Sequence, residues 1–213
     1  MKIRFDNVLP KPLANEQHAK QSVWSNNFEL NQGHFYLLNA SSGKGKSTFS
    51  SILYGLRHDY TGSILFNDQS ISEFSLVDWS NFRQTKISAV FQSLDLFPNL
   101  SVIDNLLIKN RLTDFKTEQD IVNCLETLGI ETLKNKLVGN LSMGQQQRVA
   151  IVRSLCQPFK WLLLDEPFSH LDLKNIENAI AIINEAIENQ QAGTILTTLG
   201  SDYNIKNYNT LFL

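Results

Sequence analysis

The segment NASSGKGKST, residues 39–48, combines glycine, lysine and hydroxyl residues in an order suited to phosphate binding. Gly45, Lys46 and Ser47 match the second half of the pattern G-x-x-x-x-G-K-[ST]. In such a loop, backbone N–H groups and the lysine contact phosphate oxygens, and the hydroxyl ligates Mg²⁺. The first glycine of the pattern would stand where this chain has Ala40. A glycine-rich turn with exposed lysines is the alternative that the loop by itself leaves open.

The segment WLLLDEP, residues 161–167, is an apolar run that ends in two adjacent carboxylates. The apolar run predicts a buried strand. At its end Asp165 can hold the Mg²⁺ shell, and Glu166 is placed to polarise a water against the γ-phosphate. Two solvated carboxylates at a strand end are common, but the upstream phosphate loop favours the catalytic interpretation.

A third segment, LSMGQQQR at residues 141–148, predicts the start of a helix. Ser142 is a good N-cap, and Gln145 stands three residues later, as a capping box requires. A serine and a glycine at a helix start, here Ser142 and Gly144, also form an anion site from backbone N–H groups and the helix dipole. An ordinary capped helix describes the local structure equally well.

Short apolar runs alternate with helical patterns along the chain, which predicts an α/β domain with parallel strands. The expected strands are residues 34–39, 62–68, 86–92, 161–165, 194–198 and 209–213. A helix over residues 47–56 would follow the phosphate loop directly, which is the context that confirms such a loop.

Between residues 101 and 140 the pattern is helical. Thr117 followed by Asp120 predicts a helix N-terminus, and Gly129 predicts its end. The apolar face of this helix would consist of Ile121, Cys124, Leu125 and Leu128. Farther along, Asp172 is expected to cap another helix. Its apolar stripe against a sheet would consist of Ile176, Ile180, Ile183 and Ile187.

The composition excludes several classes of protein. The 213 residues carry a net charge of −2, and 19% of them are charged, which argues against a basic nucleic-acid-binding protein. Cys124 and Cys156 match no metal spacing, so we expect reduced thiols. The N-terminus lacks the apolar run of a signal peptide, and no segment approaches the roughly 20 apolar residues of a membrane span. Any link to a membrane is expected to go through a partner.

The order of phosphate loop, VFQ (residues 90–92), LSMGQQQRVAIVRSL (141–155) and LLLDEPFSHLD (162–172) resembles the ATP-binding cassette family. The resemblance extends from about Phe5 to Leu213 and is to prokaryotic stand-alone cassettes. It implies one domain over residues 1–213, a P-loop NTPase α/β core with a parallel sheet. An N-terminal antiparallel β portion and an inserted α-helical signature subdomain, at about residues 93–156, would complete the fold.

The resemblance also implies roles for individual residues. Gln92 corresponds to the glutamine that senses Mg²⁺ and the membrane partner, and Glu166 corresponds to the catalytic base. Both are expected to be catalytic residues. Ser142, Gly144 and Gln145 correspond to the signature that contacts ATP held by the opposite subunit. The expected metal ligands are Ser47, Gln92 and Asp165. The phosphate-binding residues would be Ala40, Ser41, Ser42, Gly43, Lys44, Gly45, Lys46, Ser47 and Thr48.

Two further segments acquire a role in the same way. Residues 169–172, SHLD, correspond to the family's D-loop. LFPNLSVIDNL, residues 96–106, resembles the segment around the groove where a permease's coupling helix docks.

The function implied is that of the ATP-binding and ATP-hydrolysing subunit of a transporter, with ATP and Mg²⁺ as cofactors. If each ATP needs a phosphate loop from one subunit and a signature from another, ATP should drive head-to-tail dimerisation and hydrolysis should release it. The dimer could be a homodimer or a heterodimer with another cassette. Separate transmembrane permease subunits are the expected partners, and no nucleic acid is expected. The protein itself is expected to be cytoplasmic and peripheral on the inner face of the cell membrane.

Four departures from the family pattern bear on this interpretation. Ala40 costs roughly 1 kcal/mol or more if its backbone needs positive φ, and is harmless otherwise. Met143 replaces a glycine at a helix start, which tolerates a side chain. The family's switch histidine would fall near Leu199, Gly200 and Ser201. Its absence bears on the hydrolysis rate rather than on nucleotide binding.

The fourth departure concerns the adenine-stacking aromatic residue, which is expected in LPKPLANEQ, residues 9–17, where none occurs. Trp24 is the nearest candidate, but the alignment places it in the following strand, where a tryptophan is more often part of the core. Loss of base stacking would weaken ATP binding by roughly 1–3 kcal/mol.

Two other classes of function compete with the transporter subunit. A regulatory cassette that binds ATP and dimerises but hydrolyses little is favoured by the missing histidine and aromatic, and opposed by Lys46, Asp165 and Glu166. A cassette of DNA repair or chromosome structure would need a long coiled coil before the signature. Residues 48–141 leave no room for one and show no sustained heptads.

Overall fold

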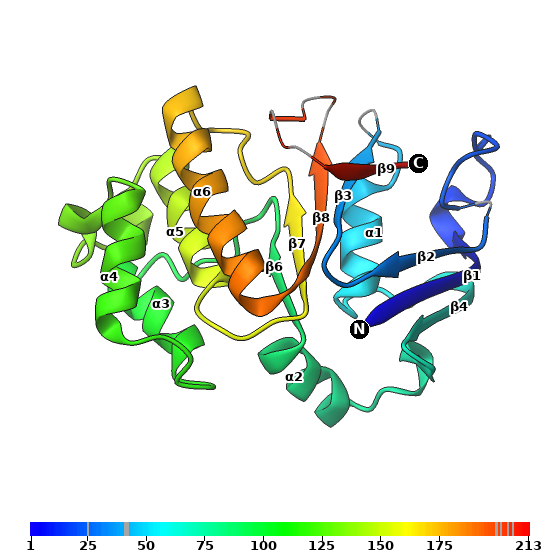
Figure 1. Ribbon diagram of the computed structural model, residues 1–213, viewed down its shortest axis with the longest axis horizontal. Coiled ribbons are helices and arrows are strands. Elements are labelled where there is room, and N and C mark those ends of the chain that lie inside the picture. The colour runs from blue at the N-terminus through cyan, green and yellow to red at the C-terminus, as the bar shows by residue number, and fades with distance from the viewer. Residues whose placement is uncertain (25, 41–42, 199, 201, 204, 206) are drawn as a thin grey trace.

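A five-stranded parallel sheet forms the centre of the molecule (Figure 1). The computed structural model describes residues 1–213 except residues 25, 41, 42, 199, 201, 204 and 206. The sheet order is β6 (Ile87–Val90), β7 (Trp161–Asp165), β8 (Gly193–Thr198), β3 (Phe35–Asn39) and β9 (Tyr208–Phe212). The expected parallel strands are confirmed, with some ends shifted by one or two residues.

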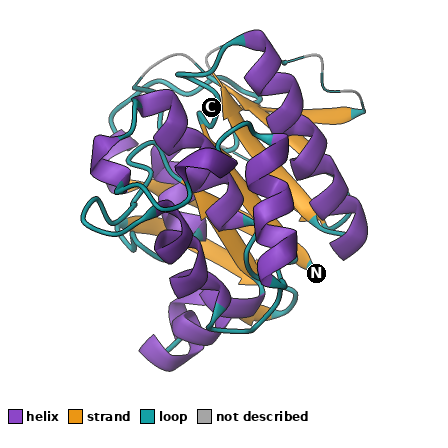
Figure 2. Ribbon diagram, turned by 90° about the vertical axis from the view of Figure 1, so that its left-hand side faces the viewer, coloured by secondary structure: helices purple, strands orange, loops and turns teal. Residues whose placement is uncertain are grey.

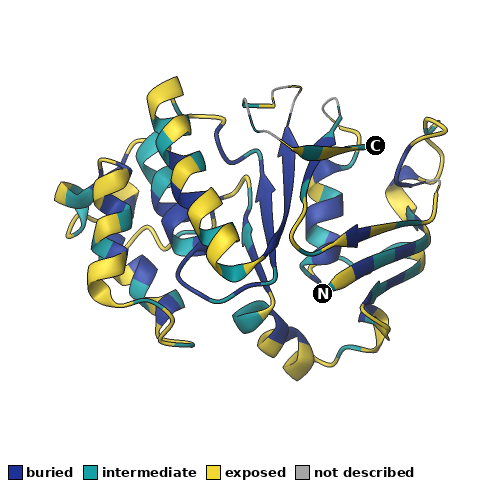
Figure 3. Ribbon diagram, viewed as in Figure 1, coloured by how far each residue is buried: buried dark blue, intermediate teal, exposed yellow. Residues whose placement is uncertain are grey.

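Both faces of this sheet are covered, so its central strands are buried along their whole length (Figure 3). Successive strand residues point to opposite faces. Leu162 and Leu164 of β7 therefore join one hydrophobic cluster, while Leu163 between them joins the other. This burial explains why the strands are continuous apolar runs in the sequence rather than alternating ones.

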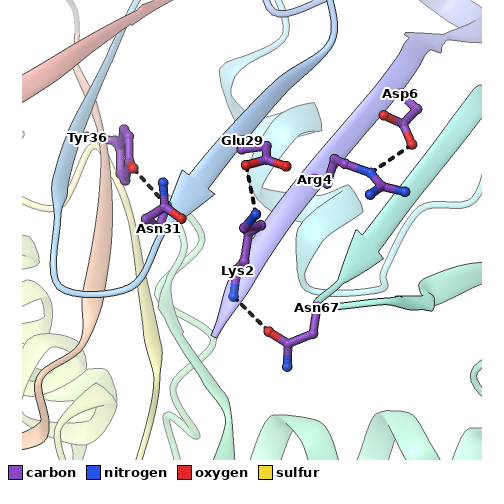
Figure 4. A network of polar contacts seen from close by, with 7 residues as sticks. All are labelled: Lys2, Arg4, Asp6, Glu29, Asn31, Tyr36 and Asn67. Carbon is purple, nitrogen blue, oxygen red and sulfur yellow. Dashed lines mark hydrogen bonds and ion pairs between the residues drawn. The ribbon is translucent and has the colours of Figure 1, made fainter.

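An antiparallel sheet from the N-terminal part of the chain has the order β2 (Phe28–Asn31), β1 (Lys2–Pro10), β4 (Tyr60–Phe66) and β5 (Gln69–Ser70). The expected strand at residues 62–68 is β4 and belongs to this sheet. Figure 4 shows how polar contacts hold it together: the Lys2 ammonium pairs with Glu29 at 2.9 Å, across β1 and β2. The backbone N–H of Asn31 donates to the Tyr36 hydroxyl at 2.8 Å, which links β2 to β3 of the parallel sheet.

The helices divide between the two hydrophobic clusters. Side chains of α1 (Lys46–Leu53) and α2 (Leu76–Thr85) join the cluster that includes the antiparallel sheet. Side chains of α5 (Met143–Ser154) and α6 (Leu173–Gln190) join the cluster on the opposite face of the parallel sheet (Figures 1 and 2). Two further helices, α3 (Val102–Asn110) and α4 (Glu118–Thr127), pack against α5. The limits of a helical subdomain at about residues 93–156 remain a prediction.

The local signals at helix ends are confirmed. Thr117 and Asp120 form a capping box at the start of α4, and Ser142 and Gln145 form one at the start of α5. The Asp172 carboxylate accepts a hydrogen bond from the third residue of α6. Short 3-10 turns complete the chain: η1 (Lys11–Leu13), η2 (Ile71–Glu73), η3 (Glu131–Leu133) and η4 (Val138–Asn140).

Two expectations need correction. The helix after the phosphate loop ends at Leu53 rather than at residue 56, because the chain turns at Gly55 with a left-handed φ of 72°. Trp24 lies in a turn before β2, not in the strand, although it is buried in the core as expected. The predicted isoleucine stripe of α6 packs against the core: Ile183 is buried, and Ile176, Ile180 and Ile187 are partly buried against the same cluster. Ala179 and Ile182 add to this buried side.

Candidate active site

The loop between β3 and α1 has the geometry of a phosphate-binding turn. Gly43 and Gly45 have φ values of 82° and 96°, in the left-handed region that favours glycine. Ala40 is not among the residues with positive φ, so the missing first glycine carries no backbone strain. Ser41 and Ser42, also predicted to bind phosphate, lie outside the described residues.

Lys46, the first residue of α1, is directed back across this loop. Its side chain is only 6% exposed. The ammonium donates to the Ala40 carbonyl at 2.9 Å and lies 3.5 Å from Glu166 Oε1. The predicted phosphate-binding cation and the predicted catalytic base are therefore brought together, although they are far apart in the sequence.

The two carboxylates after β7 have different surroundings. Asp165 is 2% exposed, and its Oδ1 accepts a hydrogen bond from the Thr197 hydroxyl on the neighbouring strand β8. The backbone N–H of Glu166 lies near both the hydroxyl and the carbonyl of Thr197, at 3.2 and 3.3 Å. Glu166 itself has a left-handed φ of 49°, which is uncommon for a residue other than glycine and turns its carboxylate into the site.

Many of the predicted residues line one cleft of about 400 Å³. Its lining consists of Leu13, Gly43, Gly45, Lys46, Ser47, Thr48, Gln92 and Glu166. Seven of the residues predicted for nucleotide, metal or base thus line one cavity, together with Leu13. Asp165 is too deeply buried to be among them, and Lys44 points instead to Glu16, with which it forms an ion pair at 3.1 Å.

Leu13 was missed by the sequence analysis, because nothing in an isolated leucine signals a ligand site. Its Cδ1 lies against the phosphate loop, only 2.7 Å from the point where a Cβ on Gly45 would be. The Trp24 indole nitrogen is 3.3 Å from the same point, in the core behind the loop. Gly45 is therefore required both by its φ and by these two neighbours. Thr197 was also missed, since its contact with Asp165 exists only across the sheet.

The signature residues stand apart from this cleft. Ser142, Gly144 and Gln145 form the N-terminal turn of α5 and do not line the cavity. Ser142 is exposed, and its backbone and hydroxyl are engaged in the capping box with Gln145. Gly144 has no room for a side chain, because a Cβ there would be 2.6 Å from the His170 carbonyl oxygen. Met143 is exposed and meets no such limit.

The region of the missing switch histidine is described only in part. Leu199 and Ser201 lie outside the described residues, and Gly200 is exposed with a φ of 113°. His170 is exposed in the turn after Glu166, where its Nδ1 lies 3.0 Å from the Ser169 hydroxyl.

A second cavity, of about 190 Å³, is lined in part by residues that flank the segment LFPNLSVIDNL in the sequence, among them Asp95 and Lys109. Aromatic and apolar side chains line it together with Lys109, Arg153 and Asp95. Arg153 stacks over the exposed Phe97 ring, 5.3 Å from its centroid. Burial, reinforced by the positive charges of Arg153 and Arg83, lowers the pKa of Lys109 to about 8. No carboxylate forms an ion pair with Lys109 among the described residues.

The described residues contain neither a membrane-spanning helix nor a cluster of metal-binding side chains. None of the helices there combines the length and the apolar character of a membrane span. No group of three or more His, Cys, Asp or Glu side chains in that part of the chain is placed to hold a metal ion.

Comparison with known proteins identifies the family of this chain. Residues 24–169 match the protein family described as ABC transporter. HrtA of Staphylococcus aureus strain MRSA252, an ATP-binding protein whose name assigns it provisionally to hemin import, is 34% identical over 175 residues. The alignment covers 81% of this chain and 79% of HrtA. HrtA of strain bovine RF122 / ET3-1 gives the same identity and coverage.

The fold has solved counterparts. The dimeric structure of MJ0796, a bacterial ABC transporter cassette, has a TM-score of 0.77 and 25% identity, and covers 92% of this chain and 87% of that one. A second MJ0796 structure, of a post-hydrolysis state bound to ADP and Pi, has a TM-score of 0.76 at 24% identity. The family match covers more than half of the sequence and includes the phosphate loop, the signature and both carboxylates. The chain therefore belongs to the ABC transporter family, as one of its ATP-binding subunits, an ABC ATPase.

Proposed function

We propose that this protein hydrolyses Mg²⁺-ATP as a dimer and transmits the resulting movement to separate permease subunits at the inner face of the cell membrane. The observation that carries the proposal is the meeting of Lys46, Gln92 and Glu166 in one cleft, at the N-terminus of α1. A helix N-terminus and an ammonium attract phosphate, and a carboxylate beside them is placed to polarise the attacking water.

The residues expected to hold Mg²⁺ fit that ion. A hydroxyl from Ser47, an amide oxygen from Gln92 and a carboxylate from Asp165 are the hard oxygen donors that Mg²⁺ prefers. Ser47 and Gln92 line the cleft, and the buried Asp165 directly precedes Glu166. The ion would neutralise charge that develops on the β- and γ-phosphates. The chain's own contribution is to orient the phosphates through Lys46 and the water through Glu166.

Dimerisation follows from the separation of the cleft and the signature. Ser142 and Gly144 do not line the cleft, so a second subunit would have to supply them. The N-terminus of α5, with exposed Ser142, is suited to contact phosphates held by that subunit. The dimeric MJ0796 cassette, which shares this fold, supports the arrangement. The partner subunit could be a second copy or a related cassette.

The Glu166→Gln variant tests the proposal, because it keeps the shape of the site and removes the base. We expect it to bind ATP, to lose turnover, and to form an ATP-dependent dimer in size-exclusion chromatography with light scattering. The control is Glu188→Gln, which changes an exposed residue of α6. A Glu166→Gln protein that stays monomeric at saturating ATP would contradict the two-subunit site.

The permease partner is tested separately. Tagged protein would be recovered from native membranes, and co-purifying proteins identified by mass spectrometry. A multi-spanning membrane protein that is lost when the cavity residue Phe91 is changed to Glu supports docking beside LFPNLSVIDNL. Recovery without any such protein counts against a transporter subunit.

The alternative is an ATP-binding regulatory cassette that dimerises but hydrolyses little. It is favoured by the sequence, which has no histidine at residues 199–201, and by the aliphatic Leu13 in the cleft. Turnover measured in the presence of the recovered partner separates the two functions. Absence of Glu166-dependent hydrolysis would favour the regulatory cassette.

A further inference from the structure

The Gln147 side chain joins the signature helix to the turn that carries Glu166. Gln147 lies in the second turn of α5 and is 2% exposed. Its Nε2 donates to the Glu166 carbonyl at 3.2 Å and to the Ser169 hydroxyl at 3.1 Å. Its Oε1 accepts from the backbone N–H of His170 at 2.9 Å. The Gln147 amide thus forms hydrogen bonds to Glu166, Ser169 and His170 in the turn after β7.

This turn needs such support because of its backbone conformation. Glu166 has a left-handed φ of 49°, and strain of this kind persists only where surrounding contacts impose it. The Glu166 carbonyl also accepts a long hydrogen bond, 3.4 Å, from the backbone N–H of Ser169. Without Gln147, the carbonyl and the His170 N–H would each lose a partner in a partly buried position.

A second contact makes the connection stiff. Gly144, one turn before Gln147, lies so close to the His170 carbonyl that a Cβ would be 2.6 Å away. The start of α5 and the turn at residues 166–170 are therefore in direct backbone contact. One helical turn farther along α5, Gln147 forms hydrogen bonds to the same turn. A displacement of this end of α5 therefore also displaces Glu166.

We propose that Gln147 is a positioning residue that makes the orientation of Glu166 depend on the signature end of its own helix. The proposal rests on the proposed function, in which Ser142 and Gly144 contact the nucleotide of the partner subunit. When the signature of one subunit binds the partner's ATP, Glu166 of the same subunit would be oriented towards the ATP bound in its own cleft. Hydrolysis at the two sites is linked, and a subunit whose signature is unoccupied holds its base out of alignment.

The test replaces Gln147 with Met, which has similar length but makes no amide hydrogen bonds. We expect kcat to fall by about tenfold or more while KM for ATP stays within about twofold, since an orienting contact is lost and no nucleotide contact is. The Hill coefficient for ATP turnover should fall towards unity. In the Glu166→Gln background, Gln147→Met should still permit the ATP-dependent dimer.

Gln157→Met is the matched control. Gln157 is also buried, and its Nε2 donates to the carbonyls of Arg83, Ile87 and Pro158, away from Glu166. Its loss should lower the melting temperature as much as the loss of Gln147, but leave turnover and cooperativity per folded molecule unchanged. If Gln147→Met does not fold, Gln147→Glu replaces it. That variant keeps the acceptor for His170 and removes the donor to Glu166, and the same fall in kcat is expected.

Hydrogen exchange gives a readout that does not depend on turnover. In the wild type, ATP should slow exchange of the amides at residues 166–170, and Gln147→Met should abolish that protection. Unchanged protection, or unchanged kcat and cooperativity in Gln147→Met, would overturn the proposal. So would equal losses in Gln147→Met and Gln157→Met. A wild type that neither hydrolyses ATP nor dimerises refutes the proposed function instead. Faster exchange at residues 166–170 in nucleotide-free Gln147→Met than in the nucleotide-free wild type then decides whether Gln147 links α5 to Glu166.

Discussion

The Lys46 ammonium lies 3.5 Å from Glu166 Oε1, so the cation of the phosphate loop and the predicted catalytic base form an ion pair within the cleft. The side chains are 6% and 18% exposed, which leaves little solvent to screen the pair. A phosphate that enters the cleft must compete with Glu166 for Lys46. The ion pair therefore couples nucleotide binding to release of the carboxylate.

The first prediction concerns this competition. Lys46→Ala should weaken ATP binding roughly 10- to 150-fold, because it removes a charge-assisted contact worth about 1.5–3 kcal/mol. Glu166→Gln should bind ATP as tightly as the wild type or more tightly, since Lys46 loses its competing partner. Isothermal titration calorimetry measures both. Lys174→Met, a change of an exposed lysine on α6, is the control. Weaker binding by Glu166→Gln would show that the pair does not compete with phosphate.

The second prediction concerns the missing glycine of the phosphate loop. Ala40 does not have positive φ, so Ala40→Gly should leave ATP affinity within about twofold and lower stability by up to about 1 kcal/mol. Gly45→Ala is the informative contrast, because φ is 96° and the new methyl group would meet Leu13. That variant should lose most ATP binding. A clear gain of affinity in Ala40→Gly would mean that the alanine impairs the loop.

The third prediction concerns the base of the nucleotide. Among the described residues that line the cleft, Leu13 is the large apolar one, and it offers no hydrogen bond to a base edge. A contact of this kind discriminates bases weakly, so dissociation constants for ATP and GTP should lie within roughly tenfold of each other. Leu13→Ala should weaken both by a similar factor, roughly tenfold for about 1.4 kcal/mol. Unchanged affinities for both nucleotides in a folded Leu13→Ala protein would limit Leu13 to core packing.

The sequence was most informative where the cause of a feature is local. The caps at Thr117, Ser142 and Asp172 depend on side chains within three residues, so their spacing predicted them correctly. The buried strand ending at Asp165 was predictable because a strand covered on both faces is a continuous apolar run. The order of the motifs indicated the family resemblance, and the resemblance in turn implied the antiparallel sheet.

Roles that arise from tertiary contacts could not be predicted in this way. Leu13 and Thr197 have ordinary sequence neighbours, and only the packing of η1 and β8 brings them to the site. Gln147 is one of three consecutive glutamines, and the helix register alone determines that it, rather than its neighbours, reaches Glu166. Trp24 was assigned to a strand because an alignment by motif does not detect a turn.

The fourth prediction is a pH dependence of stability that arises from Lys109. In the unfolded chain this lysine has the ordinary pKa of 10.5, and in the folded protein burial, followed by Arg153 and Arg83, lowers the pKa to about 8. Cys156 faces it too, but its own pKa is raised to about 12, so it stays neutral. Between pH 8 and 10.5 Lys109 binds more protons in the unfolded chain than in the folded protein. The free energy of unfolding therefore rises with pH over this range.

Lys109→Met should therefore stabilise the isolated protein at pH 7, by on the order of 1 kcal/mol, because a half-buried charge without a carboxylate partner is removed. The gain should shrink from pH 8 upwards and vanish near pH 10.5, where the wild-type lysine is neutral in both states. Denaturant unfolding at several pH values measures this, with Lys136→Met, at an exposed lysine, as the control. A gain that is independent of pH would assign the effect to packing, and a loss at pH 7 would mean that the charge is stabilised where it lies.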